Sequence, residues 1–134
     1  NADRGTTCNH TRCRTSDTTT LADTTLYATT PDMFSDSERQ RFDTLSQATR
    51  FRVFGADCYA YGLLSAGHVE LVAESNMAPH DFLALVPVVE GAGGMITDWQ
   101  GNPLDLLAGR QVLATANPAL HEQALARLDP TTAS

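Results

Sequence analysis

Three carboxylates stand where the chain is expected to pass between strands and helices. Asp57 follows a short apolar run, Glu74 ends a second one, and Asp81 opens a third. Ligand crevices in open α/β sheets lie at the carboxyl ends of the strands. We therefore expect the three side chains to meet at one edge of a sheet, with Asp81 at a helix N-terminus and partly open to solvent.

Each of these carboxylates also has a simpler interpretation. Asp57 and Asp81 suit the N-cap position of a helix, which aspartate commonly fills. Glu74 suits an ordinary solvated strand end. The functional alternative for Asp81 is coordination of a hard cation such as Mg²⁺ through oxygen. The local pattern does not decide between the two interpretations, and one residue can serve both.

Two other motifs point away from chemistry. A phosphate loop needs glycines that lead into a helix N-terminus, but Gly91-Ala-Gly-Gly94 follows a predicted helix and indicates a tight exit with close packing. The four histidines have neither HExxH nor any other paired-ligand spacing. We expect each to lie at the surface or in a loop; they are His10, His68, His80 and His121.

Composition limits the classes of partner. The 134 residues are 42% apolar and carry a net charge of −7. This length fits one domain, and the acidic balance argues against nucleic acid and anionic membrane as partners. No apolar run reaches the length of a membrane span. Cys8, Cys13 and Cys58 have no CxxC spacing, so we expect reduced cysteines and a cytoplasmic protein.

The remaining pattern predicts an α/β fold, a layered mixed sheet flanked by helices. Residues 1–20 are threonine-rich and expected to be weakly ordered or an edge segment, and 21–134 form a single α/β domain. Strands are predicted over 24–30, 51–54, 69–73, 95–97 and 112–115. Helices are predicted from a Ser35–Glu38 capping box, from Asp57, over 81–89 with a kink at Pro87, and from Asn117-Pro118. The 81–89 helix is apolar all round and therefore expected to be buried on every side.

Four segments together resemble the inositol monophosphatase superfamily, and within it the histidinol-phosphate phosphatase branch. They are residues 26–34, 54–61, 66–74, and 79–84 together with 90–99. The resemblance runs from about Leu21 to Leu128 and implies the C-terminal α/β domain of these Mg²⁺-dependent phosphatases. It implies that Asp81 binds metal and that Asp57, Ala56 and Glu74 contact the leaving-group alcohol. Acidic residues there suit an amino alcohol such as histidinol, because a carboxylate favours a nearby ammonium.

The sequence departs from that family in one major respect. The upstream Glu and the Asp-Pro-x-Asp-Gly-Thr motif, which supply the family's other metal ligands, occur nowhere in it. We therefore expect no complete catalytic set and little or no Mg²⁺ binding by the lone chain. The expected function is the substrate-binding half of a phosphomonoesterase, inactive until an N-terminal half completes it and acting on a small phosphate ester. The alternative is a non-catalytic domain that works as a homo-oligomer or interaction module.

Overall fold

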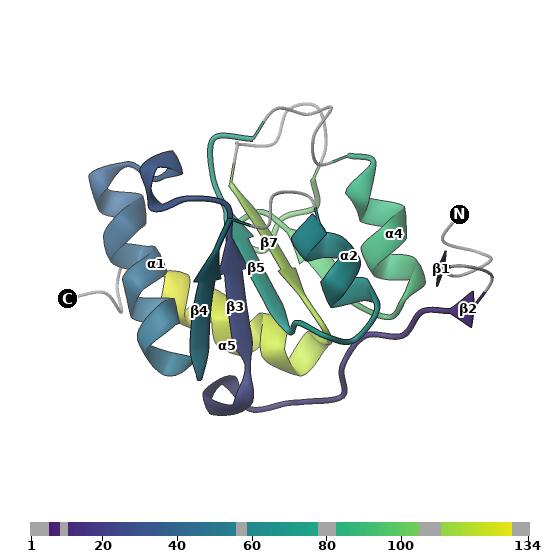
Figure 1. Ribbon diagram of the computed structural model, residues 1–134. Coiled ribbons are helices and arrows are strands. Elements are labelled where there is room, and N and C mark those ends of the chain that lie inside the picture. The colour runs from purple at the N-terminus through teal and green to yellow at the C-terminus, as the bar shows by residue number, and fades with distance from the viewer. Residues whose placement is uncertain (1–5, 9–10, 56–58, 78–82, 105–110, 130–134) are drawn as a thin grey trace.

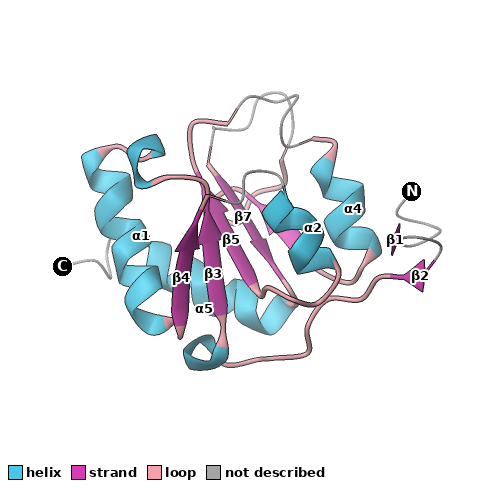
Figure 2. Ribbon diagram, viewed as in Figure 1, coloured by secondary structure: helices cyan, strands magenta, loops and turns pink. Residues whose placement is uncertain are grey.

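A mixed five-stranded sheet lies between two pairs of helices (Figure 1, Figure 2). The computed structural model describes residues 6–8, 11–55, 59–77, 83–104 and 111–129. The sheet has the order β4-β3-β5-β7-β6. Its strands are β3 (Thr25–Ala28), β4 (Phe51–Phe54), β5 (Leu71–Glu74), β6 (Met95–Thr97) and β7 (Val112–Thr115). The helices are α1 (Asp36–Ala48), α2 (Tyr59–Ser65), α4 (Leu85–Gly91) and α5 (Pro118–Leu128).

The directions of the strands determine which strand ends lie at the same edge of the sheet. β3 pairs in parallel with both β4 and β5, whereas β7 is antiparallel to β5 and to β6. Helices α1 and α5 cover one face of the sheet, and α2 and α4 cover the other (Figure 1). The predicted fold class is confirmed. The carboxyl ends of β3, β4 and β5 therefore meet at one edge.

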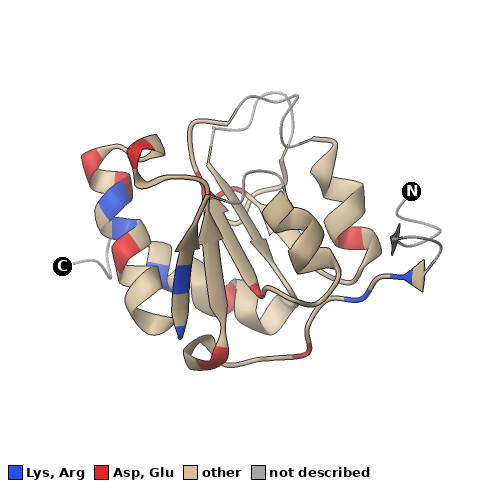
Figure 3. Ribbon diagram, in the orientation of Figure 1, with Lys and Arg blue, Asp and Glu red and all other residues tan. Residues whose placement is uncertain are grey.

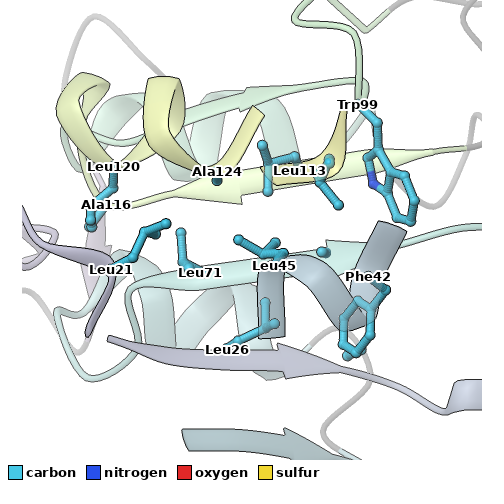
Figure 4. Close-up of a cluster of buried hydrophobic side chains, with 13 residues drawn as sticks. Leu21, Leu26, Phe42, Leu45, Leu71, Trp99, Leu113, Ala116, Leu120 and Ala124 are labelled. Carbon is cyan, nitrogen blue, oxygen red and sulfur yellow. The ribbon is translucent and has the colours of Figure 1, made fainter. Parts of the chain in front are cut away.

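The sheet separates two apolar cores because successive side chains of a strand point to opposite faces. Leu71 and Ala73 pack toward α1 and α5, while Val72 packs toward α2 and α4. Figure 4 shows the first core, in which Phe42 and Leu45 of α1 meet residues of the sheet and α5. All four residues of β5 are buried. The same holds for β7, so these two paired strands form the buried centre of the sheet.

The two longest helices begin as their sequences predict. Ser35 accepts from the Glu38 backbone N–H, and the Glu38 side chain accepts from Ser35 N, which completes a capping box at α1. Asn117 accepts from Leu120 N at 3.0 Å, with Pro118 in the first position of α5. These caps satisfy N–H groups that have no partner within a helix. Both predicted starts are confirmed.

Helix α4 differs from its prediction. It begins at Leu85 rather than at Asp81, and Ala84 occupies the N-cap position. Pro87 consequently falls in the first turn, where its missing N–H breaks no helical hydrogen bond. Of its seven residues only Val89 and Gly91 are buried, so the prediction of a helix buried on every side is also wrong. Other apolar side chains of the helix pack against the core on the α2 side of the sheet and remain partly exposed.

The glycines after α4 allow the close approach that the sequence predicts. Gly93 has φ of +103°, a conformation that favours glycine. A Cβ on Gly94 would lie 2.6 Å from the carbonyl oxygen of Thr115 on β7. The segment is therefore a tight exit from α4 onto the sheet, and the phosphate-loop alternative is rejected.

The N-terminal segment follows the domain surface toward the sheet. After two short paired strands, β1 (Thr7–Cys8) and β2 (Thr11–Arg12), Thr15 N donates to Ala92 O at 3.0 Å. The Asn117 amide donates to the carbonyls of Ser16 and Thr18 at 3.3 and 2.8 Å. Whether residues 1–20 are weakly ordered stays a prediction. Within the described ranges, no helix has the length and apolar character needed to cross a membrane.

Candidate functional site

The carboxyl edge of β3, β4 and β5 is the place where the predicted site should lie. Gly55, directly after β4, donates its N–H to Thr29 O at 2.9 Å and to Ala28 O at 3.2 Å. Its φ of +101° turns the chain out of the sheet at this point. Thr29 follows β3, and Glu74 is the last residue of β5. The edge thus brings together the ends of three parallel strands.

Glu74 is the only one of the predicted site residues that falls within the described part of the chain. It is 2% exposed, so the interpretation as a solvated strand end is wrong. Its Oε1 accepts a hydrogen bond from the Tyr61 hydroxyl at 2.7 Å. Its Oε2 accepts from Thr29 N at 3.0 Å and also from the Thr29 hydroxyl. A buried carboxylate needs such donors because burial without them is costly.

These donors fix the direction of the Glu74 carboxylate. A carboxylate offers about four acceptor positions, and the donors among the described residues take three of them. Two donors belong to Thr29, directly after β3, and one comes from α2, so the side chain is held between the sheet edge and the helix that covers it. Such a preoriented acceptor can bind an N–H or O–H group of a small molecule without first being ordered.

Asp57, Ala56 and Asp81 lie outside the described residues, so their positions remain predictions. The structure does place the strand that leads to the first two. β4 ends at Phe54, beside β3 and at the same edge as Glu74. The expected convergence of Asp57 with Glu74 is consistent with this strand order.

A second carboxylate lies at this edge, and the sequence indicated it only as a helix cap. Glu38 Oε2 accepts from the Ser75 hydroxyl at 2.6 Å and from the Gln111 amide at 2.7 Å. Burial would raise the pKa of Glu38. Hydrogen bonds from the Ser35 backbone and from the side chains of Ser75, Gln111 and Ser35 outweigh it and hold the pKa below its usual value.

Sequence reasoning missed the partners of both carboxylates, although two signals were available. Thr29 lies near the end of the strand predicted over 24–30, and Glu74 directly follows the strand predicted over 69–73, so both residues are at strand ends. Tyr61 lies in the helix predicted from Asp57, and a buried tyrosine hydroxyl usually needs a hydrogen-bond partner. No comparable signal connects Ser75 and Gln111 to Glu38, because those contacts span 37 and 73 positions.

The described residues alone do not fit a magnesium site. Among them, no group of three or more His, Cys, Asp or Glu side chains is arranged to hold a metal ion. The oxygens of Glu38 and Glu74 already accept hydrogen bonds from protein groups. Metal binding by Asp81 stays a prediction.

His121 is the clearest correction to the sequence analysis. It is 2% exposed on α5 rather than at the surface, and burial lowers its pKa to about 4. Its Nε2 lies 2.7 Å from the Thr97 hydroxyl and its Nδ1 lies 2.9 Å from the Thr115 hydroxyl. His68 is exposed as expected, and His10 and His80 lie outside the described residues. Cys13, the cysteine whose side chain the structure describes, is free and buried.

The fold is an α/β domain with a buried carboxylate at the carboxyl edge of its sheet, and similarity to known proteins identifies its family. The family model described as "Inositol monophosphatase family" matches residues 1–132. The chain therefore belongs to the inositol monophosphatase family. The predicted resemblance is confirmed.

Individual relatives agree with this assignment. The Arabidopsis thaliana "Bifunctional phosphatase IMPL2, chloroplastic" is 41% identical over 116 residues, covering 81% of this chain and 34% of the plant protein. The "Histidinol-phosphatase" of Chlorobaculum parvum is 33% identical over 72 residues, covering 54% of this chain and 27% of that protein. The chain thus spans about a third of the length of these curated relatives or less.

A solved structure shows the same architecture. An inositol monophosphatase from Zymomonas mobilis superposes with a TM-score of 0.87 at 39% identity, covering 90% of this chain and 48% of that one. The agreement extends over nearly all of this chain. The present fold is accordingly that of about one half of the solved phosphatase chain.

Proposed function

We propose that this chain forms the substrate-binding half of a phosphomonoesterase that acts on a small phosphate ester, with the phosphate ester of an amino alcohol such as histidinol favoured. One observation carries the proposal. The Glu74 carboxylate is buried at the carboxyl edge of the sheet and is held there by Thr29 and Tyr61. The names of the two curated relatives, a bifunctional phosphatase and a histidinol-phosphatase, support this choice.

The chemistry of Glu74 suits the leaving-group side of such an ester. An ammonium or hydroxyl of the alcohol can donate to the carboxylate, and a hydrogen bond to a charged partner is about twice as strong as a neutral one. Such a site discriminates against substrates that lack the donor, because they forgo this hydrogen bond to a charged acceptor. In this proposal Asp57 and Ala56 line the same pocket.

Metal binding is assigned in the proposal to Asp81, with further ligands from polypeptide outside these 134 residues. The printed sequence contains no Asp-Pro-x-Asp-Gly-Thr motif to supply them. Magnesium in such sites generally polarises the phosphate or activates water. The lone chain is accordingly expected to be inactive. A cytoplasmic location fits the cysteine pattern.

A non-catalytic role is the second candidate, and one surface feature favours it. Phe51 is 57% exposed and Val53 is 36% exposed on β4, which is an edge strand of the sheet. Exposed apolar side chains on a strand edge favour association with another chain. In this alternative the domain acts as a dimeric or interaction module.

A substrate-discrimination experiment tests the proposed function. The chain is combined with the metal-binding half of a solved family member, fused or added in trans, and kcat/KM is measured with Mg²⁺. Histidinol phosphate is compared with p-nitrophenyl phosphate, whose leaving group carries no ammonium. Glu74→Gln should lower the ratio of the two kcat/KM values by about 10- to 100-fold, the range expected for losing one hydrogen bond to a charged group.

Glu122→Gln is the matched control because Glu122 is exposed on α5. This variant should leave the ratio unchanged. If Glu74→Gln also leaves it unchanged, Glu74 does not recognise the leaving group. A combined protein that hydrolyses neither ester would favour the non-catalytic alternative.

A further inference from the structure

The Glu38 side chain makes more contacts than a helix cap requires. Its Oε1 accepts from Ser35 N at 2.9 Å, which is the capping contact. Its Oε2 instead faces the sheet, where it accepts from Ser75 at 2.6 Å and Gln111 at 2.7 Å. One carboxylate thus joins the start of α1 to the end of β5 and the start of β7.

The two sheet-side partners flank Glu74. Ser75 follows Glu74 directly and is 4% exposed. Gln111 precedes Val112, the residue that pairs with Glu74 across the β5–β7 ladder. Glu38 therefore contacts the chain immediately next to both members of the Glu74–Val112 pair.

The backbone after Ser75 shows why this point needs support. Asn76 has φ of +57°, which is uncommon for a residue other than glycine and marks a sharp turn out of β5. Backbone in such a region persists only when its surroundings hold it. The bond from Ser75 to Glu38 anchors the last residue before that turn.

Glu38 has the charge state that makes these bonds strong. The hydrogen bonds that hold its pKa below the usual value keep the carboxyl ionised at neutral pH. Bonds to an ionised acceptor are shorter and stronger than those between neutral groups. Thr29 and Tyr61 hold the Glu74 carboxylate itself, and they contact it from the residue after β3 and from α2. The contacts of Glu38 approach from α1, on the other side of the sheet.

We propose that Glu38 is a positioning residue, which holds Ser75 and Gln111 beside Glu74 and so fixes the main chain from which the substrate-binding carboxylate extends. The inference rests on the proposed function of Glu74 for its effect on substrate choice. It predicts that Glu38 influences recognition of the leaving group without touching the substrate.

Three variants separate this role from helix capping. Ser75→Ala removes one sheet-side bond and leaves the capping box intact. Glu38→Gln keeps the size of the side chain and removes its charge. Ser35→Ala weakens the cap and leaves both sheet-side bonds in place, so it is the matched control for general stability.

The first measurement uses this chain alone, with ¹³C-labelled glutamate. The carboxyl signal of Glu74 is assigned with Glu74→Gln. Ser75→Ala and Glu38→Gln should shift or broaden that signal, and Ser35→Ala should leave it in place even though it lowers the unfolding midpoint. An unmoved Glu74 signal in both Ser75→Ala and Glu38→Gln would overturn the proposal whether or not the chain takes part in catalysis.

The second measurement uses the combined phosphatase described above. Ser75→Ala and Glu38→Gln should lower the histidinol phosphate to p-nitrophenyl phosphate ratio by about 3- to 10-fold, less than Glu74→Gln, and Ser35→Ala should not change it. If Glu74→Gln alters the ratio but these two variants do not, Glu38 is only structural and the inference is wrong. If Glu74→Gln does not change the ratio, the proposed function fails. The positioning role of Glu38 is then tested by the ¹³C carboxyl signal of Glu74 alone.

Discussion

The Tyr61 hydroxyl donates to Glu74 Oε1 at 2.7 Å and thereby joins α2 to the end of β5. Both residues are buried, Tyr61 at 0% exposure and Glu74 at 2%. This bond crosses from the helix layer to the sheet at the edge where three parallel strands end. It therefore serves the fold and the candidate site together.

Removal of this bond should cost stability. Tyr61→Phe keeps the packed ring and leaves Glu74 with one donor fewer. We expect the free energy of unfolding to fall by about 1.5–3 kcal/mol, the range for hydrogen bonds to charged groups. Urea denaturation measures the change. Tyr59→Phe is the control, since Tyr59 lies in the same helix but is 69% exposed, and a loss equal to that of Tyr61→Phe would contradict the assignment.

Two glycine substitutions should act in opposite directions. In Gly94→Ala the new Cβ would meet Thr115 O at 2.6 Å and Val89 Cγ1 at 2.9 Å, whereas at Gly62 nothing lies within 4 Å. Overpacking of this kind costs about 1–3 kcal/mol. Gly62→Ala lies within α2 and should stabilise the protein by about 0.5–1 kcal/mol, because alanine favours helix over glycine. Thermal unfolding of the two variants side by side tests both signs.

His121 should make stability depend on pH. A neutral imidazole has one N–H and one acceptor nitrogen, so one of its two threonine hydroxyls must donate to the ring. Burial lowers the pKa of His121 to about 4 in the folded protein, against 6.5 for an ordinary histidine. The unfolded chain therefore binds more protons between these values. Stability from this residue should be complete above about pH 6.5 and fall as the pH drops toward 4, by on the order of 3 kcal/mol.

The control for His121 is His121→Gln, which cannot titrate in this range. It should be less stable at pH 7, and its stability should change less between pH 6.5 and 4.5 than that of the unchanged chain. Glu38 has a lowered pKa, so its contribution is lost mainly below its usual value of 4.5 and leaves the upper part of this window to His121. Equal slopes for the two proteins would contradict the prediction.

The lone chain should not hydrolyse phosphate esters. With Mg²⁺ and either histidinol phosphate or inositol phosphate, phosphate release should stay at background. Turnover near the usual enzyme range of about 1 to 1000 per second would contradict the proposal.

In the combined protein, Asp81→Asn should weaken Mn²⁺ binding and leave the unfolding midpoint nearly unchanged. Asp23 is exposed and distant in sequence from Asp81, so Asp23→Asn should change neither Mn²⁺ binding nor the unfolding midpoint.

The edge strand β4 should support self-association. Phe51 and Val53 are exposed on it, and Arg52 Nη1 of the same strand lies 3.5 Å from Asp43 Oδ1 of α1. Figure 3 shows Lys or Arg positions on both of these elements. Replacing Phe51 and Val53 by serine should shift light-scattering masses toward the monomer. Ala119→Ser, at an exposed position on α5, should have no effect. A wild-type chain that stays monomeric at high concentration would contradict this prediction.

The sequence by itself determined the order of the main helices and strands, the caps of α1 and α5, and the family. Those features depend on local chemistry and periodicity: Ser35 with Glu38 makes a capping box, Asn117-Pro118 starts a helix, and β-branched runs form strands. The start of α4 was placed too early, because an apolar run has no internal boundary and its turn at residues 83–84 carries no strong breaker.

Only the tertiary structure determined which groups the carboxylates of Glu38 and Glu74 contact and how deeply they are buried. Burial of Glu74 and its contacts with Thr29 and Tyr61 depend on which strands lie side by side, and burial of His121 depends on how α5 packs on the sheet. The contacts of Glu38 with Ser75 and Gln111 connect residues far apart in the chain, and no local pattern encodes them. Hydrogen-bond partners across a sheet follow from strand order and register, and the chain acquires these only when it folds.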